Sequence, residues 1–276
     1  MNVTGLDNLY KIVIMNPKGG CGKTTLATNT ASSFAQRGPP PTLIDCDPQG
    51  YSVRWLEQRP ASRPPIHGFT AYDSADTIAA RVGPDSRTLI LDLPAAIPHE
   101  RLHHYTYFAN TILIPIMPSA VDVHSATRFI AELLLDQQLD RHEGKLAIVA
   151  NRVKSNTKSY QMLRRFLTSL KIPLIATLRD SQNYVYAIAQ GIGVCELPAY
   201  RALDDIQQSK TIHAWLRKSR PRTPRALTEQ DRQALIAETA YRHAQERGFQ
   251  GGDPMTDWVE AEREVDALYG VGGARS

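Results

Sequence analysis

Apolar residues in the first 220 positions come in short runs that are separated by helical patterns. Six of these runs predict strands, and they lack the polar–apolar alternation of a half-exposed strand. Strands of this kind are typical of a parallel sheet whose two faces are both covered by helices. The expected strands span residues 11–16, 42–45, 88–92, 111–115, 146–150 and 173–176.

Helical patterns fill the intervals between the strands. They span residues 23–36, 73–82, 121–139, 157–170 and 204–218. Alternation of strands and helices predicts an α/β fold, with a doubly wound, mostly parallel sheet and helices on both faces. The ligand of such a fold binds beyond the carboxyl ends of the strands.

The composition changes at residues 219–225 (SRPRTPR), which are rich in proline and arginine. We therefore predict a main domain over residues 1–219, a linker over 220–227 and a small helical appendage over 228–270. Two helical patterns in the appendage, at 229–247 and 255–269, predict a hairpin of helices. Its expected apolar core consists of Tyr241, Phe249, Trp258, Val265 and Leu268.

Charge is distributed unevenly along the chain. The net charge is +4, but residues 141–225 hold 16 Lys/Arg against 5 Asp/Glu, a balance of +11, while residues 226–276 have a balance of −5. A concentrated basic block predicts a polyanionic partner. The three cysteines follow no disulfide or metal pattern, and we expect neither a signal peptide nor a membrane-spanning segment. We expect a cytoplasmic protein without a membrane partner.

A phosphate-binding loop is indicated by NPKGGCGKTT at residues 16–25, directly between a strand and a helix. Glycines let the backbone turn tightly and point its N–H groups at phosphates, and the helix N-terminus adds its dipole. We predict that the loop binds ATP with Mg²⁺. Lys23 reaches the β- and γ-phosphates, Thr24 ligates the metal, and the remaining phosphate contacts come from Gly19, Gly20, Cys21, Gly22 and Thr25.

Carboxylates follow two of the predicted strands. Asp45 and Asp47 lie in TLIDCDPQG and Asp92 lies in LILDLPAA. Side chains two residues apart in a strand point in the same direction, so Asp45 and Asp47 face one way. Three carboxylates at strand ends beside a phosphate loop predict a site that handles Mg²⁺ and the attacking water.

The loop resembles the deviant Walker A box, KGGxGKTT, of the ParA/MinD family of ATPases. Pro17 stands where the ordinary pattern has glycine, and Lys18 follows it. The resemblance covers most of residues 10–217. It implies an ATP-dependent homodimer in which Lys18 reaches the partner's nucleotide. It also implies that Lys18, Lys23, Asp47 and Asp92 take part in ATP hydrolysis.

The same resemblance assigns further roles. Asp45 is expected near the metal with Thr24 and Asp92, and Asp47 is expected to position water. The LPAA after Asp92 departs from the family's Thr-Pro-Pro, which leaves local water positioning open. Asn151 either contacts adenine or caps the end of a strand, and Pro198 lies in a loop close to the base.

Non-specific DNA binding in the ATP state is the role that the family implies for the basic block. The candidate contacts are Arg152, Lys154, Lys158, Arg179, Lys210, Arg217 and Lys218. The other reading is a solvated helix face. The function expected is that of a ParA-type ATPase that positions a plasmid, chromosome or protein compartment. A ParB-like or other adaptor would stimulate hydrolysis, and the ATP state would be nucleoid-associated.

Two alternative functions stay open. A MinD-like membrane-cycling ATPase needs a basic amphipathic C-terminal helix, whereas residues 226–276 are acidic. A P-loop metabolic enzyme needs a second substrate pocket, which a sequence does not reveal. The appendage, AYRHAQERG followed by DWVEAERE, resembles a small bacterial family of unknown function; it either docks a cargo-side partner or is a soluble tail.

Overall fold

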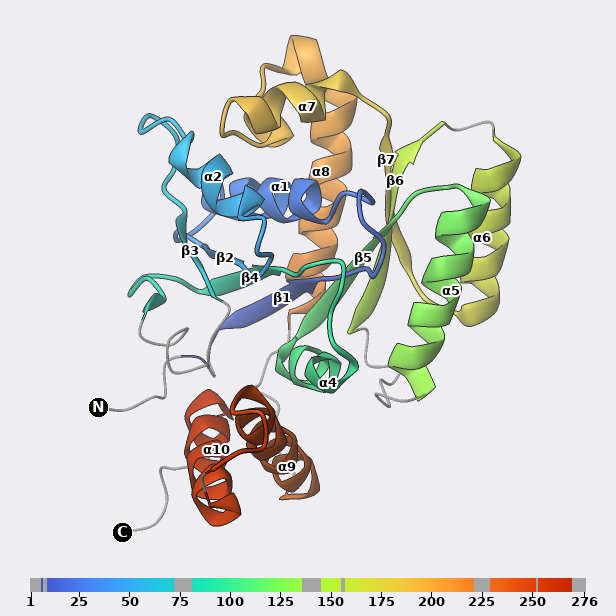
Figure 1. Ribbon diagram of the computed structural model, residues 1–276. Coiled ribbons are helices and arrows are strands. Elements are labelled where there is room, and N and C mark those ends of the chain that lie inside the picture. The colour runs from blue at the N-terminus through green and yellow to red at the C-terminus, as the bar shows by residue number, and fades with distance from the viewer. Residues whose placement is uncertain are drawn as a thin grey trace. The chain divides into compact units, whose positions relative to one another are not determined.

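The computed structural model describes residues 6, 9–71, 81–135, 145–154, 157–220, 229–251 and 253–269. These residues form two compact units, which we describe separately (Figure 1). The first unit comprises Tyr10–Tyr72 and Gly83–Arg220. The second comprises Met1–Leu9, Asp73–Val82 and Pro221–Ser276.

A seven-stranded parallel sheet is the centre of the first unit. The strands are β1 (Tyr10–Ile14), β2 (Thr42–Asp45), β3 (His67–Thr70), β4 (Thr88–Asp92), β5 (Thr111–Ile116), β6 (Leu146–Val153) and β7 (Leu174–Arg179). Their order is β3-β2-β4-β1-β5-β6-β7, and every neighbouring pair is parallel. This confirms the predicted α/β fold. Because β2 and β5 lie on opposite sides of β1, the strand order reverses there, which is where such folds bind ligands.

Helices cover both faces of this sheet. They are α1 (Lys23–Ala35), α2 (Tyr51–Glu57), α4 (His99–Phe108), α5 (Ala120–Leu135), α6 (Lys158–Leu170), α7 (Gln182–Ala189) and α8 (Ala199–Ser219), with a short 3₁₀ helix η2 (Val194–Glu196). Figure 1 shows α1, α2 and α7 on one side of the sheet and α4 on the other. The strands β1, β2, β4 and β5 are buried at every residue, as expected for a sheet enclosed by helices.

The main core lies between the sheet and helices α1 and α8. It contains Ile12 and Ile14 of β1, Leu26 of α1, and Ile212 and Leu216 of α8, all buried. Burying a side chain of this size contributes about 1.5–3 kcal/mol. The core therefore fixes α1, which begins at the end of the phosphate loop, against the sheet and α8.

Several boundaries differ from those predicted. Strand β3 and helix α2 were not expected, because HGFT has no apolar run and α2 is only seven residues long. Helix α8 begins at Ala199 rather than residue 204, with non-helical φ/ψ at Ala202. Helix α6 begins after Thr157, whose hydroxyl accepts the N–H of Tyr160 at 3.3 Å. Most of the helix predicted at 73–82 lies outside the described residues.

A hairpin of two helices, α9 (Glu229–Glu246) and α10 (Pro254–Tyr269), makes up most of the described part of the second unit. Val265 is buried in its core as expected, but Tyr241 and Phe249 were not placed correctly by the sequence. These two rings are 56% and 61% exposed and contact each other at the surface, with centroids 5.5 Å apart. Trp258 is partly buried, and the side chain of Leu268 lies outside the described part of the chain. Among the described side chains of the hairpin, the fully buried apolar ones are Leu235, Ile236, Ala261 and Val265.

Ion pairs connect the two helices of this hairpin. Arg232 in α9 contacts Glu262 at 2.6 Å and Asp266 at 2.7 Å in α10, and Arg242 contacts Glu264 at 2.7 Å. Arg247 pairs with Asp257 where the hairpin turns. Such pairs mainly set how the two helices are oriented, because a partly exposed ion pair contributes only about 0–1 kcal/mol to the free energy of unfolding.

Candidate functional site

The phosphate loop begins at the carboxyl end of β1 and is anchored to the neighbouring strand by Asn16. The amide of Asn16 donates from Nδ2 to the carbonyl of Pro115 in β5 at 2.7 Å, and its Oδ1 accepts the N–H of Lys18 at 2.9 Å. Asn16 is almost fully buried. A polar side chain satisfied on both sides in this way fixes the direction in which the chain enters the loop.

Lys23, the first residue of α1, turns its side chain back into the loop. Its Nζ donates to the carbonyls of Asn16 at 3.1 Å and Lys18 at 3.2 Å, and the residue is buried. A buried ammonium needs such partners, because an unpaired charge in the interior is costly. The ammonium is therefore held on the inner side of the loop, where bound phosphates would replace the two carbonyls as its partners.

Gly22 makes the tightest contact of the loop. Its φ is +98°, and a Cβ at this position would lie 2.1 Å from Nδ2 of Asn151. That same Nδ2 donates to the carbonyl of Cys21 at 2.8 Å. Only glycine fits here, because it tolerates a positive φ and has no side chain to meet the amide.

Asn151, near the carboxyl end of β6, thus supports the phosphate loop through its hydrogen bond to Cys21. Its Oδ1 accepts the N–H of Arg152 at 3.0 Å, so both groups of the amide are engaged by the protein. The sequence did not reveal this supporting role, because Cys21 lies 130 residues away. The adenine contact expected for Asn151 stays a prediction.

The two strand-end aspartates lie side by side in the sheet. Asp45 ends β2 and Asp92 ends β4, and the two residues are paired in the parallel register. Asp92 is also paired with Ile14, the last residue of β1. The structure therefore brings both carboxylates to the carboxyl ends of the central strands, where the phosphate loop begins.

Asp92 has a carboxylate that is only half satisfied. Its Oδ2 accepts the hydroxyl of Ser52 at 2.7 Å, whereas its buried Oδ1 has no hydrogen-bond partner among the described residues. Burial raises the pKa of Asp92 to about 6, while Ser52 and Thr24 oppose the rise. An unpaired buried carboxylate oxygen beside a hydroxyl is a set of ligands that suits a hard cation such as Mg²⁺.

Asp45 is held differently. Its Oδ2 accepts the N–H groups of Ser52 at 2.8 Å and Val53 at 3.1 Å, and its Oδ1 accepts that of Asp47 at 3.1 Å. The carboxylate therefore serves the start of α2, where N–H groups lack partners within the helix. Burial raises its pKa. The metal contact expected for Asp45 stays a prediction, and in this conformation both oxygens are occupied.

The remaining site residues surround this edge. Asp47 is partly exposed, and its Oδ1 accepts the N–H of Gln49 at 2.9 Å. Thr24 and Thr25 lie in the first turn of α1 and are partly buried. Pro198 is exposed directly before α8. Their roles toward water, metal, phosphate and base stay predictions.

The segment that leads to Pro198 is fixed by polar contacts to α1 and to Arg59, the residue that follows the end of α2. Asn29 of α1 accepts the N–H of Val194 on its Oδ1 at 2.7 Å. Arg59, which follows α2, contacts Glu196 with two nitrogens at 2.7 and 3.0 Å, and both side chains are buried. This buried pair holds the pKa of Glu196 below its usual range. No local pattern in the sequence signals this clamp.

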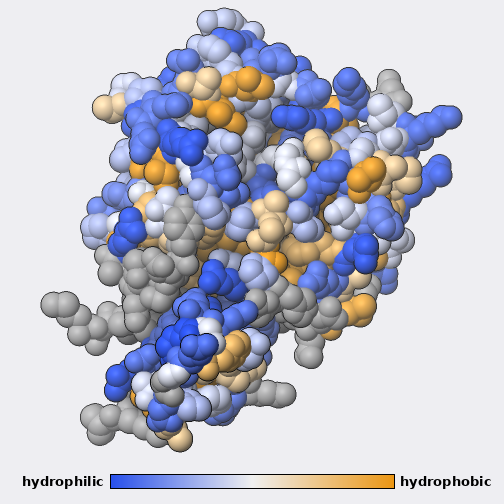
Figure 2. Space-filling model, in the orientation of Figure 1, coloured by the Kyte–Doolittle hydropathy of each residue, from blue (hydrophilic) through white to orange (hydrophobic). Residues whose placement is uncertain are grey.

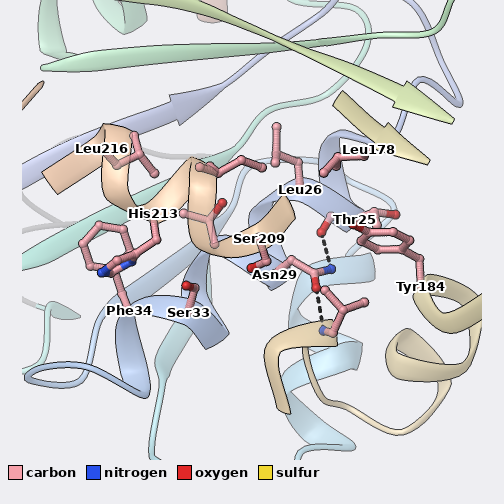
Figure 3. Close-up of a pocket in the computed structure, with 13 residues that line it drawn as sticks. Thr25, Leu26, Asn29, Ser33, Phe34, Leu178, Tyr184, Ser209, His213 and Leu216 are labelled. Carbon is pink, nitrogen blue, oxygen red and sulfur yellow. Dashed lines mark hydrogen bonds between the residues drawn. The ribbon is translucent and has the colours of Figure 1, made fainter. Parts of the chain in front are cut away.

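A small cavity of about 10 Å³ lies between α1 and α8, enough for about one water (Figure 3). It is lined by Thr30, Phe34, Tyr184 and His213, among others. The hydroxyl of Tyr184 and both ring nitrogens of His213 are buried without a hydrogen-bond partner among the described residues. Burial lowers the pKa of His213 to about 4. The cavity is too small for a nucleotide.

The predicted DNA contacts fall into two groups. The exposed ones lie on β6, the loop after it, α6 and α8; they are Arg152, Lys154, Lys158, Lys210, Arg217 and Lys218. Arg179 instead donates to Asp205 from two nitrogens, at 2.7 and 3.0 Å, and lies 3.3 Å from Asp204. Two aspartates thus neutralise the charge of Arg179, which makes it the weakest candidate of the seven.

Membrane spans and ready-made metal clusters are both absent from the part of the chain that the structure describes. No helix there is long and apolar enough to cross a membrane. No group of three or more His, Cys, Asp or Glu residues there is arranged to hold a metal ion by itself.

Comparison with known proteins identifies the family. The family described as CobQ/CobB/MinD/ParA nucleotide binding domain matches residues 12–194, and a family of unknown function, DUF2934, matches residues 231–267. Maintenance of carboxysome distribution protein A of Halothiobacillus neapolitanus is 27% identical over 205 residues, 72% of this chain and 94% of that protein. Protein ParA of Rhizobium radiobacter is 24% identical over 166 residues, 59% of this chain and 72% of that protein.

Solved structures agree on the fold. A putative plasmid partition protein of Borrelia burgdorferi bound to AMPPNP has a TM-score of 0.58 and 15% identity, covering 76% of this chain and 99% of that one. A Cyanothece McdA variant in complex with ATP also has a TM-score of 0.58, with 19% identity, covering 77% and 96%. With its phosphate loop at the reversal point of a parallel sheet, this chain belongs to the CobQ/CobB/MinD/ParA nucleotide-binding family and is a P-loop ATPase of the ParA/MinD type.

Proposed function

We propose that this ATPase forms an ATP-dependent homodimer, binds DNA without sequence preference in that state, and positions a cargo. The observation that carries the proposal is the loop itself, in which Lys18 precedes a complete phosphate cradle. Lys23 is held inside the loop by backbone carbonyls, whereas the side chain of Lys18 is 30% exposed at its mouth. A lysine at the mouth is the one able to reach a second subunit.

ATP binds to the inner side of the loop in this proposal. The N–H groups of residues 19–25 and the ammonium of Lys23 bind its phosphates, and the start of α1 adds its dipole. Thr24 and the unpaired Oδ1 of Asp92 would hold Mg²⁺. The metal, when bound, neutralises charge that develops on the phosphates. Asp47, at the partly exposed edge of the site, positions the attacking water.

Dimerisation is supported by apolar side chains around the start of α8. Val185, Tyr186, Tyr200 and Leu203 are exposed, Tyr200 by 93%. Figure 2 shows hydrophobic residues interspersed with hydrophilic ones in the upper part of the view, where Figure 1 places α7. Exposed apolar residues gathered in one area mark an interaction surface. A symmetric dimer would bury this area and place each Lys18 at the partner's nucleotide.

DNA binding rests on the exposed basic side chains of the first unit. Lys210, Arg217 and Lys218 recur seven and eight residues apart on α8, so they share one side of that helix. Such contacts neutralise phosphates and read no sequence. The cargo is a plasmid, chromosome or protein compartment; the name of the carboxysome-distribution relative supports a compartment, and the plasmid partition protein among the similar structures supports a plasmid. We further propose that a ParB-like or other adaptor on the cargo stimulates hydrolysis.

The test is binding to a random-sequence DNA duplex over a series of salt concentrations. We expect binding with a non-hydrolysable ATP analogue and none with ADP, and a steep loss of affinity with salt. Lys18→Ala is expected to abolish it, whereas Arg217→Ala is expected to weaken it and lower the salt slope by about 1. Equal binding with ATP analogue and ADP would refute the proposal. Binding to anionic liposomes instead would favour a MinD-like function.

A further inference from the structure

The helical hairpin carries an exposed pair of aromatic rings that its own packing does not use. Tyr241 in α9 and Phe249 in the turn after it contact each other, yet each is more than half exposed. The hairpin's core is filled by smaller side chains instead. Because burying an aromatic ring would stabilise so small a unit, two rings at its surface call for a reason other than folding.

Phe249 is also held in a backbone conformation that a bulky residue rarely adopts. The end of α9 accounts for a positive φ at Gly248, whose N–H donates to the carbonyl of Gln245 while the N–H of Phe249 donates to that of Ala244, both at 2.8 Å. It does not account for the φ of +56° at Phe249 itself, which a glycine or asparagine would adopt more easily. Strain that presents an exposed ring indicates a role for that ring at the surface.

The side of α9 that leads to the aromatic pair is uncharged. Ala234, Ala237 and Tyr241 are three and four residues apart, so they lie on one side of the helix, and all three are exposed. Gln233 and Gln245 extend this strip in the same spacing and are exposed as well. Small, uncharged side chains allow the backbone of a partner to approach the helix closely, next to the two rings.

Carboxylates dominate the charge of the hairpin around this strip. Residues 226–276 hold 5 Lys/Arg against 10 Asp/Glu. Arg232, Arg242 and Arg247 are already paired with acids of α10, while Asp253 and Glu260 are exposed. The net field is therefore negative. It repels DNA, an anionic membrane and a second copy of the hairpin, and it attracts a cationic polypeptide.

We propose that Tyr241, Phe249 and the uncharged strip of α9 form a docking surface for an arginine-containing, cationic segment of a partner protein. Aromatic faces attract guanidinium groups, and arginine stacks on them better than lysine because its charged group is planar. The first unit shows the same contact internally, where the guanidinium of Arg201 lies 3.7 Å from the ring centroid of Tyr186. The carboxylates of the hairpin supply the steering and fix the sign of the partner's charge. The proposal concerns the hairpin and does not depend on the proposed function of the first unit.

The test uses the full chain without nucleotide and a fluorescein-labelled peptide of alternating arginine and glycine, with binding read by fluorescence anisotropy. We expect saturable binding that the Tyr241→Ala/Phe249→Ala protein weakens about tenfold, from about threefold for each ring. The matched control is Tyr51→Ala, which removes a tyrosine of the first unit that is 55% exposed, and no change is expected. A lysine–glycine peptide should bind more weakly than the arginine peptide, and a citrulline–glycine peptide should not bind.

A salt series separates the rings from the carboxylates. The Tyr241→Ala/Phe249→Ala protein should keep the wild-type salt dependence, because the rings carry no charge, whereas Asp253→Asn/Glu260→Gln should reduce it. Because all four side chains are exposed, an unchanged urea midpoint of the first unit and unchanged helix content by circular dichroism verify that each variant is folded.

Two results with the peptide would overturn the inference: no binding to the wild type, or equal affinity for the wild type and the Tyr241→Ala/Phe249→Ala protein. The same two proteins are compared for binding to duplex DNA and to anionic vesicles, and for self-association by sedimentation. We expect the removal of the rings to leave all three unchanged. If it abolished one of them, that polyanion or a second copy would be the occupant of the surface, and a cationic segment would be ruled out.

Discussion

Gly22 offers the sharpest test of the packing beneath the phosphate loop. Gly22→Ala puts a methyl group where the structure leaves 2.1 Å to Nδ2 of Asn151, at a φ of +98°. The left-handed backbone costs an L-residue about 1–2 kcal/mol. Forcing atoms into a filled space adds about 1–3 kcal/mol. We expect the free energy of unfolding to fall by about 2–5 kcal/mol in total.

Neighbouring glycines separate these two costs. Gly20 has a φ of +75° but open space around its Cβ position, so Gly20→Ala should lose only about 1–2 kcal/mol. At Gly19 a Cβ would meet nothing within 4 Å and the φ is not positive, so Gly19→Ala should be nearly neutral. The expected loss in the free energy of unfolding thus increases from Gly19→Ala to Gly20→Ala to Gly22→Ala. Backbone strain separates the first two variants, and the contact with Asn151 separates the last two.

The assay is urea unfolding of the nucleotide-free protein, with unchanged m-values as the sign that only stability has changed. A double-mutant cycle with Asn151→Ala isolates the clash. We expect the Gly22→Ala/Asn151→Ala protein to be more stable than the sum of the single losses by about 1–3 kcal/mol. Additivity within about 0.5 kcal/mol, or equal losses for Gly20→Ala and Gly22→Ala, would refute the reasoning.

Three further predictions follow from the charges of the site. Because the pKa of Asp92 is about 6, a metal ion must displace a proton from this carboxyl below that pH. The affinity for Mg²⁺–nucleotide should therefore rise about tenfold per pH unit up to about pH 6 and then level off. Asp92→Asn should flatten this profile in a titration of nucleotide binding. Arg59→Met strands the buried Glu196 and should cost about 3–5 kcal/mol in urea unfolding. Since the pKa of Glu196 is lowered in the fold, this penalty should shrink as the pH falls and the carboxyl is protonated; a constant penalty would contradict the account. Arg179→Ala should lower stability without lowering the salt slope of DNA binding, whereas Lys218→Ala should lower the slope by about 1 and leave stability unchanged.

The sheet and the phosphate loop could be predicted because their signals are local. A run such as the one in β4 is apolar at consecutive positions, and the glycines of the loop lie between such a run and a helical pattern. Asp45 and Asp92 lie side by side because they end two parallel strands whose carboxyl ends lie on the same side of the sheet. These features need no knowledge of which distant residues meet.

Features that depend on distant partners were missed for the same reason. Helix α2 starts where the carboxylate of Asp45 receives N–H groups seven and eight residues later, so its beginning is set by a buried side chain rather than by a local cap. The contact of Asn151 with Cys21 joins residues far apart in the chain. Tyr241 and Phe249 were placed in the core of the hairpin because aromatic residues are usually buried, whereas the structure fills that core with smaller side chains.

The central claim, that Lys18 acts on the partner's nucleotide, is tested most directly by mixing two inactive variants. A Lys18→Ala subunit keeps every other group of its own site and lacks only the lysine that it would give to its partner's nucleotide. An Asp47→Asn subunit keeps Lys18 but lacks the proposed water-positioning group of its own site. In a mixed dimer, the Lys18→Ala subunit would receive Lys18 from the Asp47→Asn subunit. With random pairing, we expect the equimolar mixture to recover about a quarter of wild-type ATPase activity, although each variant alone is inactive. A mixture as inactive as its components would contradict the claim, because a lysine that acts within its own subunit cannot be supplied by another.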